Sequence, residues 1–273
     1  MSEDPREEDV GSKPERMRIA FVGKGGSGKS TIAGTFARLL ARTGEPVLAL
    51  DSDPLPGLPY ALGIPVDDQP IPDEVVVPGP EGGPRWVLHP ELDARTVIER
   101  FAVIAPDGVR YLQFGNLRGH VAVLQRAQHA WSQVVRDLDP GAFHVVGDLP
   151  GGTRQPMFGW AKYADLVCVV VEPTAKSLHS ARRLLSLETA AWGPRQILLV
   201  ANKVDRADEL SRIEERLQRP VAVAVPADPA VAAADRLGAA PLDAAAEGPF
   251  VSCVRDLVDA VTGLYPLIQE VKG

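Results

Sequence analysis

The segment RIAFVGKGGSGKST, residues 18–31, carries the strongest indication of the fold in this sequence. Residues 18–22 form a short, mostly apolar run, which is typical of a buried strand, and Gly23 ends that run. From residue 30 to residue 42 the apolar residues recur at helical spacing, and Gly44 follows as a helix stop. We therefore expect a strand, a glycine-rich loop and the start of a helix.

The loop of this stretch matches the pattern G-x-x-x-x-G-K-[ST] in the strand-to-helix context that the pattern requires. Glycines let backbone N–H groups turn inward around phosphate oxygens, and the first turn of a helix adds the positive end of its dipole. Lys29 is expected to bind the β- and γ-phosphates of a nucleotide, and the Ser30 hydroxyl is the expected Mg²⁺ ligand. The predicted phosphate-binding residues are Gly23, Gly25, Gly26, Ser27, Gly28, Lys29, Ser30 and Thr31.

Short apolar runs and longer amphipathic stretches alternate along the rest of the chain. The further predicted strands are residues 46–50, 111–114, 144–146, 166–171, 196–201 and 221–225, and the further predicted helices are residues 121–138, 177–191, 210–217, 229–237 and 250–271. This alternation predicts an α/β fold with a doubly wound, mostly parallel sheet flanked by helices, the fold of P-loop nucleoside triphosphatases.

The chain is expected to form a single domain over residues 17–273. Residues 1–16 are polar and rich in acids, so we interpret them as a disordered tail. Residues 54–92 hold many of the 25 prolines and interrupt the alternation, so they are expected to be an irregular insertion within the domain.

Composition restricts the classes of function. The formal net charge of −7 does not favour a broad nucleic-acid-binding surface. No apolar run is long enough for a transmembrane helix, and the last predicted helix carries acids where a membrane-binding helix would carry lysine and arginine. The two cysteines, Cys168 and Cys253, lie in apolar runs and are expected to be buried reduced thiols, which indicates the cytoplasm.

Acidic residues follow two of the predicted strands. Asp51 and Asp53 end the second strand in the sequence Asp-Ser-Asp-Pro, and Asp148 ends a later strand and is followed by Gly151 and Gly152. Carboxylates at the carboxyl ends of parallel strands face the ligand crevice. An aspartate before proline can also form a turn, which would explain one of the first pair but not both.

These motifs together resemble those of the MinD/ParA/nitrogenase-iron-protein superfamily over about residues 18–242. Lys24 gives the loop the "deviant Walker A" form Lys-Gly-Gly-x-Gly-Lys-Ser. The resemblance implies that Lys24 crosses a dimer interface to the other subunit's nucleotide. It also implies that Asp53 orients the attacking water and that Asp51 supports the metal shell. Asp148 resembles the Walker B acid that holds Mg²⁺ through a water, and the glycines after it resemble a switch loop.

Within the superfamily, the loop and the residues after Asp53 are most similar to CooC-type ATPases, which assist maturation of nickel carbon monoxide dehydrogenase. Those proteins carry a Cys-x-Cys metal pair, whereas this chain has no cysteine between Phe114 and Cys168. No thiolate nickel site is therefore expected. His120 and His129 lie nearby in sequence and are interpreted as surface or core residues.

Two motifs disagree about the base. The sequence from Asn202 and Lys203 to Asp205 resembles the guanine-binding element Asn-Lys-x-Asp of GTPases. The segment Pro226, Ala227 and Asp228 resembles the one that lines the adenine site of ParA and MinD. We favour ATP, because the adenine-type segment agrees with the dimer-type phosphate loop; Asp205 is otherwise a helix N-cap.

The sequence therefore predicts an enzyme, a cytoplasmic Mg²⁺-dependent ATPase that acts as a nucleotide-switched homodimer. Its partner is expected to be a client protein such as a metalloenzyme being matured, with the client surface within residues 55–131. The alternatives are a ParA/MinD-like positioning ATPase that binds DNA or membrane, and a GTPase that uses Asp205.

Overall fold

The computed structural model describes residues 16–66, 71–72, 75–113, 121–152, 160–186 and 196–270. Its main sheet has eight strands in the order β10-β9-β8-β1-β7-β2-β6-β5, and all neighbours are parallel except β5 and β6. The strands are β1 (Arg18–Gly23), β2 (Val47–Asp51), β5 (Val103–Ile104), β6 (Arg110–Gln113), β7 (His144–Asp148), β8 (Leu166–Val171), β9 (Gln196–Asn202) and β10 (Val221–Val225). The predicted fold class is confirmed.

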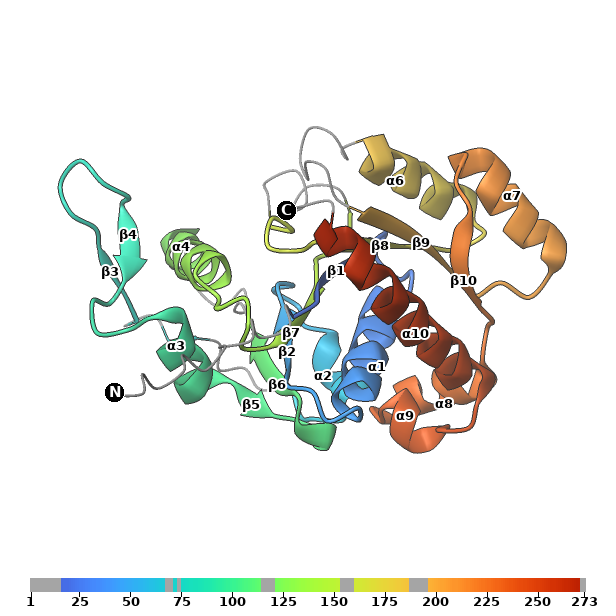
Figure 1. Cartoon of the computed structure of the whole chain (residues 1–273), viewed down its shortest axis with the longest axis horizontal. Coiled ribbons are helices and arrows are strands. Elements are labelled where there is room, and N and C mark those ends of the chain that lie inside the picture. Colours follow the sequence, from blue (N-terminus) through green and yellow to red (C-terminus); the bar gives the residue numbers. More distant parts are fainter. Residues whose placement is uncertain are drawn as a thin grey trace, which may run out of the picture.

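Helices cover both faces of this sheet (Figure 1). One face packs against α1 and α10, and the other packs against α3 and α4 at one end and α6 and α7 at the other. The helices are α1 (Lys29–Ala41), α2 (Leu58–Leu62), α3 (Ala94–Phe101), α4 (Val121–Arg136), α6 (Ala175–Ser186), α7 (Ala207–Leu217), α8 (Pro229–Leu237), α9 (Pro241–Ala244) and α10 (Pro249–Glu270), with a 3₁₀ turn, η2 (Pro106–Gly108).

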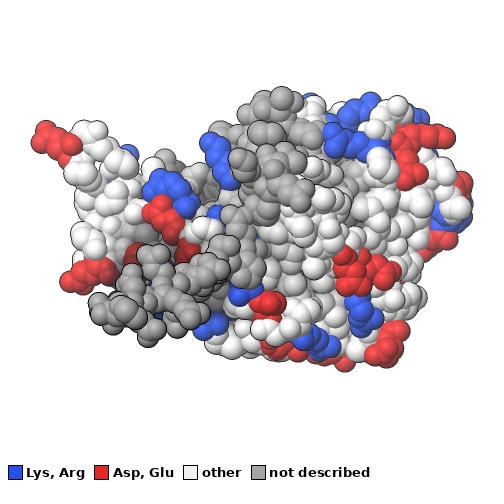
Figure 2. Space-filling model, viewed as in Figure 1, with Lys and Arg blue, Asp and Glu red and all other residues white. Residues whose placement is uncertain are grey.

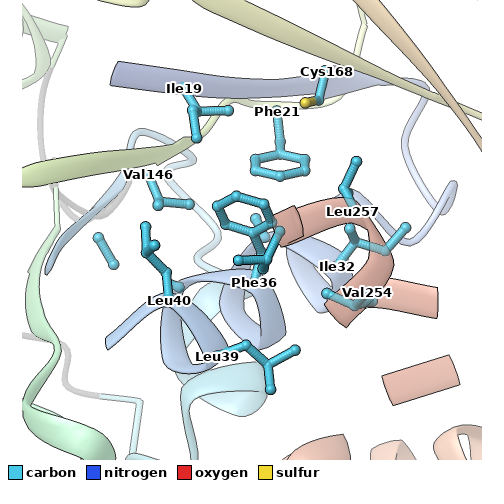
Figure 3. Packing of buried hydrophobic residues seen from close by; sticks show 14 of the residues in the cluster. Ile19, Phe21, Ile32, Phe36, Leu39, Leu40, Val146, Cys168, Val254 and Leu257 are labelled. Carbon is cyan, nitrogen blue, oxygen red and sulfur yellow. The ribbon is translucent and has the colours of Figure 1, made fainter. Parts of the chain in front are cut away.

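The core on the α1 side is a layer of aliphatic and aromatic side chains between the sheet and two helices (Figure 3). Phe21 of β1 meets Phe36 of α1 edge to face, with ring centroids 5.6 Å apart. Val254 and Leu257 of α10 are fully buried against the same layer. The terminal helix therefore packs on the core, as its apolar spacing predicts.

Residues 54–92 contain more structure than the sequence predicts. Helix α2 packs on α1, and β3 (Val76–Pro78) pairs antiparallel with β4 (Trp86–Leu88) in a separate hairpin that extends away from the main sheet (Figure 1). The expectation of an irregular insertion therefore does not hold in these parts. The elements are only three to five residues long, which is too short for a periodic pattern to show.

Two other expectations are wrong, at Arg16 and at Cys253. Arg16, expected to end the disordered tail, pairs with Glu45, and its carbonyl accepts from the Tyr265 hydroxyl at 2.8 Å. Residues 1–15, and residues 187–191 of the predicted helix 177–191, lie outside the described part of the chain. Both cysteines are reduced and Cys168 is buried, but Cys253 is only partly buried on α10, so the prediction of two buried thiols is wrong for Cys253.

Candidate nucleotide site

The carboxyl ends of β1, β2 and β7 meet at one edge of the sheet, because these strands are parallel and adjacent. The loop of residues 23–31 leaves β1 at this edge and enters α1, which begins at Lys29. Asp51 and Asp148 are the last residues of β2 and β7, and the register places them side by side. The structure thus brings the predicted phosphate loop and both aspartate positions to one place.

The shape of the phosphate loop depends on glycine and on a contact from β9. Gly26 and Gly28 have φ values of 83° and 85°, a region that residues with a Cβ rarely adopt. A Cβ on Gly28 would lie 2.2 Å from Nδ2 of Asn202. That same Nδ2 donates to the Ser27 carbonyl at 2.8 Å. Asn202 therefore supports the loop from behind.

Lys29 and Asp148 form the charged centre of the site. The Lys29 Nζ lies 3.7 Å from Oδ1 of Asp148 and 3.5 Å from Oγ of Ser30. Asp148 is fully buried, and its carboxylate lies near Ser30 and Lys29 without a hydrogen bond of normal geometry among the described residues. Burial raises the pKa of Asp148, and the nearby Lys29 ammonium offsets only part of that rise.

Asp51 organises the chain that follows β2. Its Oδ1 accepts from the Asp53 N–H at 2.9 Å, and its Oδ2 accepts from the Leu58 N–H at 3.1 Å, where α2 begins. The pKa of Asp51 is raised well above its usual value by burial and then by the charge of Asp148. Asp53 is only partly buried, so its side chain lies at the open edge of the site.

The chain after Asp148 packs directly against the phosphate loop. The Gly152 N–H donates to the Gly23 carbonyl at 2.9 Å. A Cβ on Gly151 would lie 2.8 Å from the backbone N and Cα of Gly25. The two segments are thus too close for side chains between them. Residues 153–159, which follow the two glycines of the predicted switch loop, lie outside the described residues.

A cavity of about 670 Å³ runs from the phosphate loop to the predicted base segment. Its volume is within the range of ligand sites, about 300–1,000 Å³. Five of its lining residues, four on α8 and one at the start of α10, were not predicted from the sequence. The lining residues are Gly26, Gly28, Lys29, Ser30, Thr31, Asn202, Lys203, Asp205, Pro226, Ala227, Asp228, Pro229, Val231, Ala232, Asp235 and Phe250.

The residues of the predicted base pocket are tied to the protein itself. The Lys203 Nζ donates to the Gly26 carbonyl at 3.0 Å and to Oε1 of Glu172 at 2.6 Å. Oδ1 of Asp205 accepts from the Ala227 N–H at 3.1 Å. Oδ1 of Asp228 caps α8 by accepting from Ala230 N at 2.9 Å. These contacts hold the cavity walls in place. They already use one carboxylate oxygen of Asp205, the residue that would bind guanine in a GTPase.

Other predicted residues lie apart from this centre. The Lys24 Nζ donates to the Gly25 carbonyl at 3.1 Å and is partly exposed. His129 is exposed on α4, and His120 lies outside the described residues. Burial raises the pKa of Cys168 to about 12, so this thiol stays protonated in the core. The described residues contain no group of three or more histidine, cysteine or acidic residues placed to hold a metal ion.

Comparison with known proteins agrees with this geometry. Residues 19–242 match the family model described as the CobQ/CobB/MinD/ParA nucleotide binding domain. The chain is 30% identical over 235 residues to the carbon monoxide dehydrogenase accessory protein CooC of Rhodospirillum rubrum, covering 81% of this chain and 88% of that protein. It is 29% identical to an ATP-binding protein of Methanocaldococcus jannaschii, covering 81% and 90%. The solved structure of MinD with Mg-ADP from Pyrococcus horikoshii has the same fold, with a TM-score of 0.70 at 18% identity over 93% of this chain and 98% of that one.

Proposed function

Because the chain belongs to the CobQ/CobB/MinD/ParA nucleotide-binding family, we propose that it hydrolyses ATP with Mg²⁺ as a nucleotide-switched homodimer. One observation carries this proposal. Lys29 lines a nucleotide-sized cavity, and its Nζ lies 3.7 Å from Oδ1 of Asp148, a fully buried carboxylate without a hydrogen bond of normal geometry among the described residues. A buried carboxylate without hydrogen bonds is costly, so this arrangement favours a bound cationic partner.

The residues at this edge fit Mg²⁺. The ion takes oxygen ligands and keeps several of its waters, so it needs few protein groups. Ser30 would supply a hydroxyl, and Asp148 would accept hydrogen bonds from the bound waters. Asp51 already accepts two backbone N–H bonds and would act through the loop that it holds. When bound, Mg²⁺ would neutralise charge on the phosphates.

Each residue of the proposed site then has a defined role. The Lys29 ammonium and the backbone N–H groups of residues 23–31 hold the phosphates. Asp53 orients the attacking water and accepts its proton, and Asp51 positions Asp53 through the Asp53 N–H. The Gly152 contact with Gly23 couples the loop after β7 to the phosphate loop, so the departure of a phosphate can move both.

ATP is proposed as the substrate in preference to GTP. The Asp205 carboxylate holds the Ala227 backbone, and Lys203 holds Gly26 and Glu172. An apolar wall that includes Pro226, Val231 and Phe250 suits the face of a purine without selecting guanine. Competition of GTP and ATP for a fluorescent ADP analogue would test this choice, and a preference for GTP that Asp205→Asn shifts towards xanthine nucleotides would overturn it.

The partner is proposed to be a client protein in the cytoplasm. One relative is an accessory protein of carbon monoxide dehydrogenase, which favours a client that is a metalloenzyme. The client surface would lie within residues 55–131, which include the β3–β4 hairpin. None of the described helices has the length and apolarity needed to cross a membrane. A net charge of −7 argues against nucleic acid as the partner.

Steady-state hydrolysis tests the proposal. The wild-type protein should release phosphate from ATP with Mg²⁺ and not with EDTA. Asp53→Ala should retain ATP binding but turn over about 10²–10⁴-fold more slowly, since this is the usual contribution of a positioned proton acceptor. Near-normal turnover by Asp53→Ala would remove this residue from the mechanism.

The partner is tested with the same variant. Asp53→Ala bound to ATP serves as the bait for capture of a client protein. Co-pelleting of the protein with DNA or liposomes would favour a positioning ATPase instead.

A further inference from the structure

A second cavity, of about 360 Å³, lies between α6 and α7 and shares no lining residue with the nucleotide cavity. We call it the α6–α7 groove. Its polar lining consists of Arg182 and His179 from α6 and Arg212 and Arg216 from α7, and its other lining residues are Pro173, Ala175 and Leu178. Its volume is near the lower end of the range for small-molecule sites.

The basic residues of each helix share one face, and both faces line the same cavity. His179 and Arg182 are three residues apart on α6, and Arg212 and Arg216 are four residues apart on α7, so each pair lies on one helix face. Two hydrogen bonds fix the groove. Arg182 Nη2 donates to the Arg216 carbonyl at 3.1 Å, and Arg212 Nη2 donates to the Pro173 carbonyl at 2.9 Å. A guanidinium has five N–H donors, so most of the donors are left for a ligand.

The charge of the groove is unbalanced. No aspartate or glutamate is among its described lining residues, so three guanidinium groups surround one cavity in a protein whose net charge is −7. Figure 2 shows basic side chains over α6, with acidic side chains over the neighbouring α7. Like charges around a cavity repel one another, and a bound anion removes that repulsion.

We propose that the α6–α7 groove binds a phosphoryl group, either free phosphate or a small phosphate monoester. Guanidinium forks match phosphate oxygens with paired N–H donors. A phosphoryl group near its second ionisation carries more charge than a carboxylate and has three acceptor oxygens, which suits three arginines better. The groove is a site separate from the nucleotide's phosphates, because Lys29 and the glycine-rich loop lie in the other cavity.

The test is a titration of the full-length protein with inorganic phosphate at constant ionic strength, followed by the side-chain Nε–Hε NMR signals of its arginines. The signals of Arg182, Arg212 and Arg216 should shift and saturate with one dissociation constant. Arg182→Ala and Arg216→Ala should each weaken binding about tenfold, the effect of losing a hydrogen bond to a charged group. A parallel titration with O-phosphoserine distinguishes the sources, since tighter binding of the ester indicates an organic phosphate.

Arg183→Ala is the matched control, because Arg183 is an exposed arginine of α6 that does not line the groove. It should leave the dissociation constant unchanged. In the wild-type protein, the Arg183 signal should drift linearly with phosphate concentration. The proposal is overturned if the signals of Arg182, Arg212 and Arg216 also drift linearly without saturation. It is also overturned if Arg216→Ala, with a wild-type melting temperature, binds phosphate as the wild type does.

Discussion

At the scale of single residues, the meeting of Lys29 with Asp148 connects sequence to chemistry. The sequence already indicates a role for both residues. Phosphate binding needs a cation after the glycines, and metal binding needs an acid at a strand end. The structure adds the 3.7 Å separation and the complete burial of the carboxylate.

Lys29→Ala should weaken ATP binding by about 10- to 100-fold, because a hydrogen bond to a charged group contributes about 1.5–3 kcal/mol. Isothermal titration calorimetry would measure the loss. Lys176→Ala is the control, since Lys176 is an exposed lysine outside the nucleotide cavity. An unchanged affinity for Lys29→Ala would refute the assignment of the phosphate site.

Asp148→Asn should change how stability depends on pH in the protein without nucleotide or metal. The folded-state pKa of Asp148 is raised from 3.8 to about 6, so its neutral form is the favoured one. Its stabilising contribution is complete below the unfolded pKa and is lost as pH rises through the folded pKa. The variant should therefore gain stability relative to the wild type between about pH 4 and pH 7, by on the order of 1–3 kcal/mol.

Urea unfolding in EDTA at several pH values would show this difference. Asp259→Asn, at an exposed position on α10, should give no such trend. A constant difference between Asp148→Asn and the wild type across this range would mean that Asp148 ionises normally in the folded protein.

At the scale of elements, the predictable parts are those in which a pattern repeats. Helices such as α1 and α8 repeat apolar residues at helical spacing. Six sheet strands are mostly apolar runs of five or more residues, namely β1, β2, β7, β8, β9 and β10. The helix α2 and the β3–β4 hairpin are too short to show a period. Phe250 and Val231 of the nucleotide cavity are ordinary apolar residues whose meeting depends on how α10 packs beside α8, and no local signal marks them.

The packing of α2 on α1 gives a prediction at this scale. A Cβ on Gly34 of α1 would lie 2.5 Å from Cβ of Ala61 of α2. Gly34→Ala should therefore destabilise the protein by about 1–3 kcal/mol through overpacking, against a gain of up to about 1 kcal/mol in helix propensity. Thermal or urea unfolding would measure the change.

The control is Gly263→Ala, because a Cβ at that position of α10 would have no neighbour within 4 Å. That substitution should be neutral or stabilising. Ala61→Gly should relieve Gly34→Ala in the double variant, and additive losses in the double variant would show that the two helices do not conflict at this contact.

At the scale of the whole molecule, the open edge of the sheet explains why a second copy is proposed. Asp53 lies partly exposed at this edge, and the Lys24 ammonium contacts the Gly25 carbonyl of its own loop. Among the described residues, Lys24 forms no ion pair with Asp53 or Asp148 of its own chain. A lysine there can neutralise charge that develops on the phosphate held by a facing subunit, as an arginine finger does.

Lys24→Ala should accordingly bind ATP as the wild type does but lose hydrolysis. Wild-type turnover per subunit should rise with protein concentration until dimers saturate, because a monomer lacks the second lysine. Analytical ultracentrifugation with ATP and Mg²⁺ would locate the dimerisation range. Turnover that does not vary across this range would contradict a shared site.

The most direct measurement mixes two inactive variants, Lys24→Ala and Asp53→Ala, and follows ATP hydrolysis. In a mixed dimer, one nucleotide has Asp53 from its own chain and Lys24 from the other, so one complete site is restored. Random pairing makes about half of the dimers mixed, so activity should return to about a quarter of the wild-type rate. The contrary result is a mixture that is no more active than the two variants measured separately, at concentrations where the wild type hydrolyses ATP. That result would contradict the proposal that Lys24 acts on the nucleotide of the facing subunit.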